Sequence, residues 1–355
     1  MKNKLLTTTA IAGLLVSGAA FAQTTVSGNL DLTYKGFSNK ADKARSGRGF
    51  GKESQINITN KGKLNNGMDY VAGFSIEHDG AESGSAATVT TTSGTAMFNE
   101  NVYIDFISGK TTLTIGADHI QNPDYEITNL AGVYDLDDVV SGINGTGPTS
   151  FITHVGSPYS NFGLGLTQDL GVGKFSVYYA PSQAHVAGAS DGGFTTHASY
   201  VDGSNSTYEI GFRGDLGVKG LDAGLFYNST DSNDKGTNTN SADNYKASLR
   251  YTAGSVTFAG AMAQQETNTS ATTTTKKSKS VGVAFAANKD LTVGIAHGRT
   301  DAGVAATPLD EKITVISVGY SLGPVGLGVA VGKVDNYGNA AIDGKTALFT
   351  ATTKF

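Results

Sequence analysis

The chain has 355 residues, with 26 basic and 31 acidic side chains, 47 glycines, six prolines and no cysteine. Without cysteine it can form neither a disulfide framework nor a cysteine-based zinc site. The excess of acidic residues argues against nucleic acid as a partner.

Residues 1–22 are expected to be a cleaved targeting signal. Lys2 and Lys4 precede an apolar stretch, and Ala20-Phe21-Ala22 is a small-x-small cleavage site. The alternative, a membrane anchor, is disfavoured because the apolar part is short for a bilayer span. The mature chain would then be one domain, 23–355. Loss of the two lysines leaves 24 basic against 31 acidic residues, a net charge near −7.

Apolar and polar residues alternate through most of the chain after residue 22. From Val26 to Gly36 the even positions are mainly apolar and the odd positions polar, which is typical of a half-buried strand. No stretch reaches the roughly 18 apolar residues that a membrane-spanning helix needs. Fifteen further segments share the alternation: 56–58, 68–76, 102–106, 113–117, 162–166, 175–179, 208–212, 221–227, 245–251, 256–262, 281–285, 291–295, 316–322, 325–331 and 347–355.

The connectors between these segments alternate between short turns and long polar loops. This pattern predicts an all-β fold, a transmembrane antiparallel up-and-down β-barrel of 16 strands with both termini at the short-turn rim. Eighteen strands would result if 151–156 and 194–200 were also strands. The long loops are 38–52, 78–96, 119–158, 182–205, 230–242, 265–278, 299–311 and 335–344.

The competing fold is a soluble sandwich of two sheets. Long loops on one side only are poorly explained by two packed sheets, and aromatic residues near the strand ends favour membrane interfaces. Glycines on the polar faces suit a face that looks into water, which we expect for Gly326 and Gly328. On the same reasoning Leu249 should face lipid, and its neighbour Ser248 should face water. Small outward residues that would let a neighbouring barrel approach are Gly28, Ala72, Ala117, Ala347 and Ala351.

Three segments resemble the Gram-negative general porins. Phe355 ends an alternating strand, as in the assembly signal of outer-membrane barrels. Residues 134–142, in the longest loop, are similar to the acidic stretch of the porin third loop, and 157–163 to the return into strand six. The resemblance covers the mature chain. It implies outer-membrane localisation, a third loop folded into the lumen, and a homotrimer. Ser141-Gly142 stands where the family usually has Gly-Arg, so the detailed constriction departs from the pattern.

Candidate pore residues follow from the distribution of charge. Residues 111–173 contain no lysine or arginine, and acids in a narrowed pore bias it toward cations. A solvated acidic loop is the alternative. The candidate acids are Asp118, Asp124, Glu126, Asp135, Asp137 and Asp138. The candidate bases are Lys35, Arg213, Lys246 and Arg250 on polar faces, with Arg45 and Arg48 in the first loop.

Other chemistries find little support. Asp135, Asp137 and Asp138 could hold Ca²⁺ through clustered carboxylates, although no EF-hand spacing is present. No Gly-x-Ser-x-Gly motif occurs and the six histidines are scattered, so no enzyme is expected. We expect a porin for passive diffusion of small hydrophilic solutes and ions, mildly cation-preferring. The alternatives are a substrate-selective channel and an adhesion or structural barrel.

Overall fold

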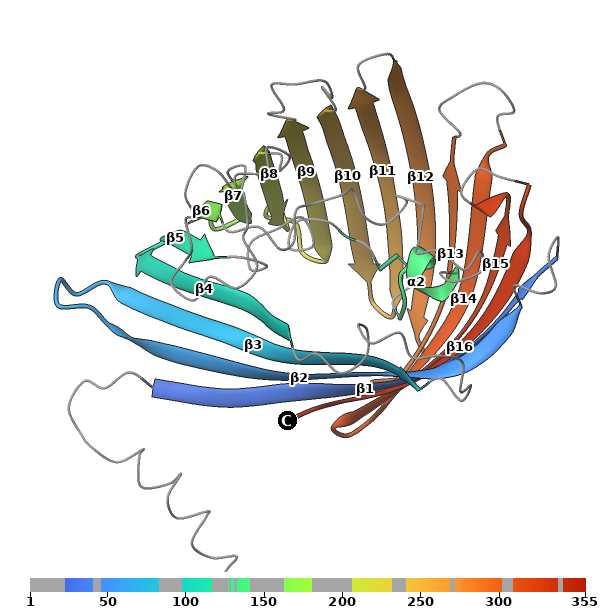
Figure 1. Cartoon of the computed structure of the whole chain (residues 1–355), viewed down its shortest axis with the longest axis horizontal. Coiled ribbons are helices and arrows are strands. Elements are labelled where there is room, and N and C mark those ends of the chain that lie inside the picture. The colour runs from blue at the N-terminus through green and yellow to red at the C-terminus, as the bar shows by residue number, and fades with distance from the viewer. Residues whose placement is uncertain are drawn as a thin grey trace, which may run out of the picture.

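The segments in which apolar and polar residues alternate form sixteen strands, and these close into a single antiparallel barrel in the computed structural model (Figure 1). The structure describes residues 23–40, 46–82, 98–116, 127, 129–130, 133–140, 163–180, 206–231, 241–268, 272–301, 309–337 and 341–355. The strands are β1 (Gln23–Asn39), β2 (Gly47–Lys63), β3 (Asp69–Glu82), β4 (Phe98–Ser108), β5 (Thr111–Gly116), β6 (Gly163–Asp169), β7 (Lys174–Ala180), β8 (Ser206–Gly214), β9 (Leu221–Asp231), β10 (Ser241–Ala253), β11 (Val256–Asn268), β12 (Thr273–Ala286), β13 (Leu291–Thr300), β14 (Glu311–Leu322), β15 (Val325–Asp335) and β16 (Gly344–Lys354).

Each strand pairs with its neighbours in the chain, and β1 pairs with β16 to close the ring. The predicted count of sixteen is confirmed. The segments 151–156 and 194–200, which would have raised it to eighteen, lie outside the described residues. In the sheet, β5 pairs directly with β6 and β7 with β8.

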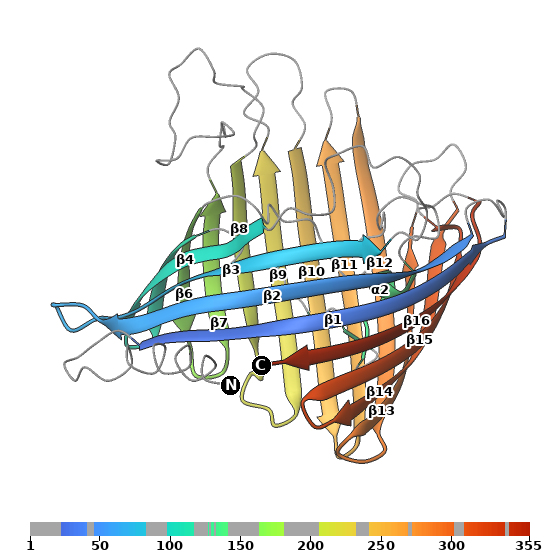
Figure 2. The ribbon, with the colours of Figure 1, turned by 60° about the horizontal axis from the view of Figure 1, so that its bottom comes forward.

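Short hairpin turns gather at one rim, where β1 begins and β16 ends. Gly109 (φ 58°) and Gly323 (φ 61°) lie in two-residue turns, in a left-handed conformation that glycine adopts without strain. Figure 2 shows the C-terminus at this rim. The side view therefore agrees with the expected position of that terminus.

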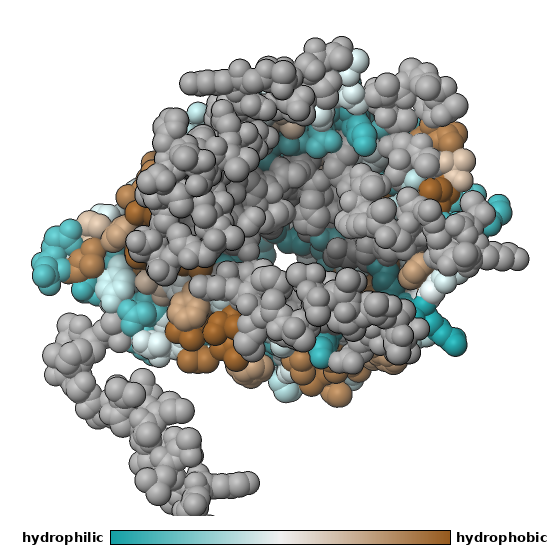
Figure 3. All heavy atoms as spheres, viewed as in Figure 1, coloured by the Kyte–Doolittle hydropathy of each residue, from teal (hydrophilic) through white to brown (hydrophobic). Residues whose placement is uncertain are grey.

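The two faces of the wall differ as the alternation predicts. On β10, Leu249 is 50% exposed on the outer face, whereas Ser248 is 6% exposed on the inner face. Figure 3 shows hydrophobic residues in brown on the outer side of the barrel and hydrophilic residues in teal toward its middle. The outer face therefore presents the apolar surface that a membrane requires. None of the described helices is both long and apolar enough to cross a membrane.

The seam of the barrel joins Gly28 on β1 to the last residue, Phe355. The two residues exchange backbone hydrogen bonds of 2.8 and 2.9 Å. A β-carbon at position 28 would lie 2.6 Å from the ring of Phe355 and 2.5 Å from the carbonyl oxygen of Gln55. Gly28 is therefore small because the terminal ring covers it. This corrects its assignment to a surface left open for a neighbouring barrel.

Candidate functional site

The loop between β5 and β6 enters the barrel and lies along the inner wall. The backbone N–H of Ile127 donates to Ser248 Oγ on β10 at 3.2 Å. Farther along, Leu130 lies over Gly282 on β12, and Val133 lies 3.2 Å from the β-carbon position of Gly319 on β14. The described part of this loop thus crosses the wall from β10 toward β16. The prediction that the third loop folds into the lumen is confirmed.

Beyond Val133, the loop is fastened to β15 and β16. The hydroxyls of Tyr134 and Thr350 share a hydrogen bond, and the Tyr134 ring lies over Gly328. Burial raises the pKa of the Tyr134 hydroxyl above its ordinary value. The helix α2 (Leu136–Val140) follows, inside the ring of strands in Figure 1. Its Val139 carbonyl accepts a hydrogen bond of 2.6 Å from Thr346 Oγ1.

An apolar core fills the space between this loop and the wall. Leu136, Val139 and Val140 are each no more than 1% exposed. Close approach to β15 requires glycine, since a β-carbon at Gly332 would lie 2.9 Å from both valine side chains. The wall side of the core consists of inward residues from β11 and β13–β16: Ala259, Ala261, Ala296, Ile313, Val315, Ala330, Val334 and Leu348.

This core corrects the expectation that the inner faces of these strands look into water. Gly328 and Ser248 are inward-facing, as predicted, but the loop covers both. The sequence carried a signal of this burial. Both faces of β14 have apolar residues, with Ile313 and Val315 on the inner face and Ile316 and Val318 on the outer face. Strands buried on both faces read as continuous apolar runs rather than as alternation.

The wall formed by β1–β4 carries acidic side chains on its inner face. Asp31 on β1 lies directly opposite Glu53 on β2. Farther along this wall, Glu77 accepts a hydrogen bond of 3.5 Å from Gln55, and Asp105 accepts one of 2.5 Å from Thr114. All four acids share the inner face with Gln55 and Thr114 in the strand registers.

The register fixes the level of the docked loop relative to this acidic wall. Thr350, which bonds Tyr134, is the cross-strand partner of Thr33 on β1. Thr33 lies between Asp31 and Lys35, which share the inner face of β1. The loop carries half-buried Asp135 next to Tyr134. Asp31 thus lies on the inner wall at the level where the loop, with Asp135 in it, is attached.

Two predicted pore bases lie in an ion cluster close to the short-turn rim. Arg213 donates to both carboxylate oxygens of Asp222 at 3.1 and 2.9 Å, and Arg250 donates to the same carboxylate at 2.6 Å. Arg213 is one residue from the end of β8, and Asp222 one residue from the start of β9. These arginines are inward-facing, as expected, and lie close to the short-turn ends of their strands; on β10, Arg250 is two residues along the inner face from Ser248, to which the loop is bonded.

The other predicted bases divide three ways. Lys35 lies on the inner face of β1. Lys246 also points inward but is only 4% exposed, so the lumen does not reach it freely. Arg48 belongs to β2 and pairs with Gly36, on the same outer face as the Tyr34–Phe50 ring contact, which corrects its placement in a pore-lining loop. Arg45 lies outside the described residues.

Only part of the predicted acidic set can be placed. Asp135 precedes α2, and Asp137 and Asp138 belong to it, although their side chains lie outside the description. Asp118, Asp124 and Glu126 are outside the described residues altogether. A Ca²⁺ site on Asp135, Asp137 and Asp138 stays a prediction. Within the described part of the chain no cluster of three or more metal-binding side chains occurs.

Sequence reasoning missed several inward lysines near the short-turn rim. Lys61 and Lys63 lie at the end of β2, which is longer than the alternation indicated, and Lys63 pairs with Asp69 at 2.5 Å. Lys174 and Lys354 lie on the inner faces of β7 and β16. The sequence could have indicated them, because Lys61 and Lys174 stand beside predicted short turns. The short-turn mouth thus carries several inward bases.

Comparison with known proteins shows which family and which solved structures this chain resembles. The model of a family described as Gram-negative porin matches residues 7–339. A loop-deletion variant of the outer membrane protein OmpT of Vibrio cholerae is similar with a TM-score of 0.67 and 11% identity, covering 95% of this chain and 100% of that chain. The trimer form of OmpT has a TM-score of 0.60 and 11% identity, with 94% and 99% covered.

An anion-selective porin from Comamonas acidovorans is also similar. Its TM-score is 0.65 at 12% identity, with 94% of this chain and 100% of that chain covered. At these identities the likeness concerns the fold. No curated protein sequence matches the chain.

Proposed function

The chain belongs to the Gram-negative porin family, and we propose that it forms a water-filled, cation-preferring channel for passive diffusion of small hydrophilic solutes and ions. Its strands cross the outer membrane, and the lumen between them is the solute path. Solutes would be selected by size at the docked loop and by the charge of the lining. No chemical step is involved. Removal of residues 1–22 stays a prediction.

The observation that supports the cation preference is the row of acids on the inner face of β1–β4, with further acids in the loop attached at this level. Asp31 and Glu53 face each other across a strand pair on the wall, and Asp135 lies on the loop. Like charges directly opposite each other repel, and passing cations relieve that repulsion. A row of acids lowers the energy of cations in the pore and raises that of anions.

Apart from Lys35, the inward bases named above are paired, buried or near the short-turn mouth. Arg213 and Arg250 share the Asp222 carboxylate, and Lys246 is buried in the wall. Lys61, Lys174 and Lys354 lie on the inner face near the short-turn mouth. Screening by salt weakens their influence across a wide mouth more than at a constriction. Lys35 lies two residues along the inner face from Thr33, the cross-strand partner of Thr350.

We also propose a homotrimer. Support comes from the trimer form of OmpT, to which the fold is similar, and from small outward residues on strands near the seam. Ala72, Ala347 and Ala351 remain as small outward positions, whereas Gly28 is covered by Phe355. Small residues allow close packing between barrels in lipid. Unheated electrophoresis tests this proposal: a band of one protomer mass with full channel conductance would reject it.

Conductance in planar lipid bilayers separates the pore from its alternatives. The open channel should give steps in current that grow with salt concentration. A structural or adhesion barrel with a closed lumen would insert without such steps. A substrate-selective channel would pass ions but be blocked by its own solute. Steps that no small sugar or amino acid blocks at low concentration support the general porin.

A further inference from the structure

A cavity lies in the lumen between the docked loop and the short-turn rim, and its volume is about 390 Å³. Val133 and Tyr134 of the loop border it on one side, and Lys289 and Asp290 of the turn between β12 and β13 border it on the other. Its wall is built by the short-turn ends of β13–β16. Sites for small molecules have volumes of roughly 300–1,000 Å³. We call this cavity the sub-loop pocket.

Hydroxyl groups line the wall of the sub-loop pocket. Thr292 on β13, Ser321 on β14, and Thr350 and Thr352 on β16 contribute one each. The strand registers place all four on the inner face. Ser321 is exposed and the three threonines are half-buried, so a solute in the lumen can reach them. Thr350 is already bonded to Tyr134, which leaves Thr292, Ser321 and Thr352 for a ligand.

Glycines form the floor between these hydroxyls, namely Gly319, Gly326 and Gly328. Tyr134 covers Gly328, but the space over Gly326 differs. Among the described residues, the only atom within 4 Å of a β-carbon placed at Gly326 would be Thr352 Oγ1, at 3.0 Å. The missing side chain leaves bare backbone beside Ser321, the cross-strand partner of Gly326, where a ligand can approach closely. A flat ring could lie against this floor.

The two charged side chains at the edge of the pocket lie side by side. Lys289 Nζ and Asp290 Oδ2 are 3.2 Å apart. The turn that carries them is held to β14 by a hydrogen bond of 2.8 Å, which the backbone N–H of Ser321 donates to the Asp290 carbonyl. Apart from this pair, the described lining of the pocket has no charged side chain. The lining therefore suits a neutral ligand better than an ion.

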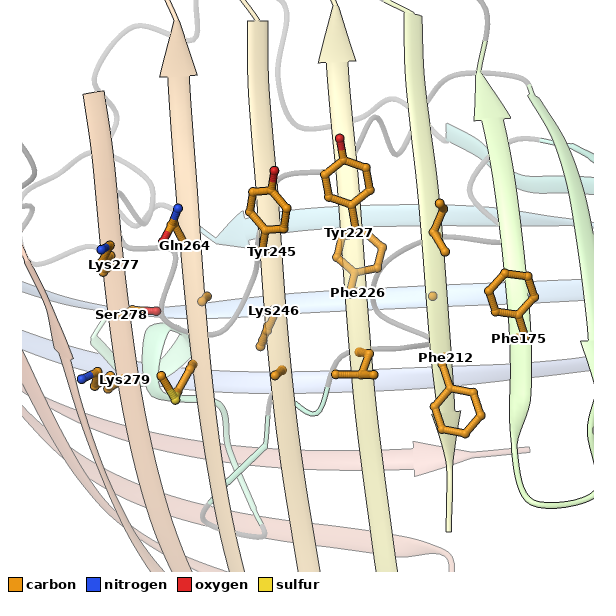
Figure 4. Close-up of a pocket in the computed structure, with 16 residues that line it drawn as sticks. Phe175, Phe212, Phe226, Tyr227, Tyr245, Lys246, Gln264, Lys277, Ser278 and Lys279 are labelled. Carbon is orange, nitrogen blue, oxygen red and sulfur yellow. The ribbon is translucent and has the colours of Figure 1, made fainter. Parts of the chain in front are cut away.

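The inner wall of β9–β12 has a different character. Phe226, Lys246 and Ser278 belong to the inner faces of β9, β10 and β12 (Figure 4), and all three are buried. Closer to the rim, Thr252 and Thr257 are hydrogen-bonded to each other at 3.0 Å. These hydroxyls are therefore buried or bonded to one another, whereas those of the sub-loop pocket face the solute path.

We propose that the sub-loop pocket binds a neutral, polyhydroxylated solute such as a hexose on its way through the pore. Each protein hydroxyl can donate one hydrogen bond and accept others, as each hydroxyl of a sugar can, so the two sets match. The sugar ring lies against Gly326, with hydrogen bonds to Ser321, to Thr352 and to the Asp290 carboxylate. Binding is weak because both sets give up hydrogen bonds to water. The pocket is a brief stop on the diffusion path, and the inference rests on the proposed open channel.

The test measures the current noise of the purified full chain in planar bilayers, with D-glucose added to the salt solution on both sides. A bound sugar interrupts part of the ion current, so the noise should rise with glucose and saturate in the millimolar range. The variant S321A with T352A should raise the half-saturating concentration roughly tenfold, because two hydrogen bonds of ordinary strength are lost. The matched control, T25A with T112A, removes two other inward hydroxyls near the short-turn ends of β1 and β5 and should respond like the unaltered chain.

Two further arms test the shape and the chemistry of the pocket. Gly326→Val fills the floor and should abolish the glucose noise while the channel still conducts. A polyethylene glycol dimethyl ether of similar mass accepts but does not donate hydrogen bonds, and should give no such noise. Equal noise from this ether or from the amino acid glycine, or an unchanged glucose response in either variant, would overturn the proposal. Lack of current steps without glucose would refute the open channel itself, whereas normal steps without any glucose noise would refute only the pocket.

Discussion

The ring of Tyr134 lies over Gly328, and its hydroxyl oxygen is only 1.9 Å from the position that a β-carbon of residue 328 would occupy. The same hydroxyl is hydrogen-bonded to Thr350 on the next strand. One missing side chain on the wall thus provides the place where the loop is fastened. A glycine at one position of β15 therefore decides how closely the loop approaches the wall.

The first prediction concerns Gly328→Val. The added side chain would push Tyr134 and the following helix away from the wall and toward the axis, so single-channel conductance should fall. Overpacking of this kind costs roughly 1–3 kcal/mol, which the barrel can bear. Gly49→Val is the control, because it also lies on the inner face but has no atom within 4 Å of its β-carbon position. Equal conductance in both variants would show that the Tyr134 contact does not set the pore.

The second prediction compares the two faces of β10. Leu249→Arg should cost roughly 2–4 kcal/mol if the residue lies near the midplane of the bilayer. Ser248→Arg should also destabilise, by roughly 1–3 kcal/mol, because Ile127 covers this serine and donates to its hydroxyl. Gly49→Arg, which points into open lumen, should cost little. The measurement is the free energy of unfolding in lipid vesicles, and a Ser248→Arg variant as stable as Gly49→Arg would refute the covered inner face.

The third prediction concerns the acids of the loop. Replacing Asp135, Asp137 and Asp138 by asparagine should reduce the cation preference while leaving the barrel folded, since the three lie in the loop. The control replaces Asp301, Asp310 and Asp335, which removes three charges from the outer wall and should leave selectivity unchanged. Selectivity is measured as the zero-current potential in a salt gradient. Loss of folded protein in the loop variant would instead indicate that these acids hold the loop, through Ca²⁺ or the wall.

The fourth prediction tests the seam. Gly28→Leu should destabilise the barrel by roughly 1–3 kcal/mol, because the new side chain meets the ring of Phe355 and the Gln55 carbonyl. Phe355→Ala should restore part of that loss in the double variant, as expected for residues in contact. Urea unfolding measures both. Strictly additive effects would mean that the two residues do not interact.

The role of Phe355 as an assembly signal has its own control. Phe285→Ala removes another outward aromatic ring from the short-turn end of a strand and should leave the yield of folded protein nearly unchanged. Phe355→Ala should reduce that yield more strongly. Similar yields would remove the assembly role and leave Phe355 as a packing residue over Gly28.

Much of the fold could be predicted because alternation is a local signal. Every segment such as 245–251 or 325–331 overlaps a strand, and the outward position of Leu249 followed from the period alone. The level of a residue along the barrel axis could not be read this way. Arg213 and Arg250 were correctly placed on the inner face, yet they lie close to the short-turn ends of their strands, because strand tilt and register set the height.

The docked loop was harder to foresee in detail. The resemblance to the porin family supplied its entry into the lumen, but its resting place depends on contacts between residues far apart in the chain. Gly328 was expected to face water, whereas it forms, with Gly282, Gly319 and Gly332, the surface on which the loop packs. Ser248 was misread for the same reason. The two-residue alternation alone does not distinguish an inner face covered by a distant segment from an inner face exposed to water.

The central claim is that acids at the level of the docked loop make the open channel prefer cations. The most direct test is the zero-current potential of the unaltered chain in a planar bilayer, with potassium chloride more concentrated on one side. The account predicts that the dilute side becomes positive, because potassium crosses more readily than chloride. A negative dilute side would contradict it, and would show that Lys35 and the lysines of the short-turn mouth govern the pore.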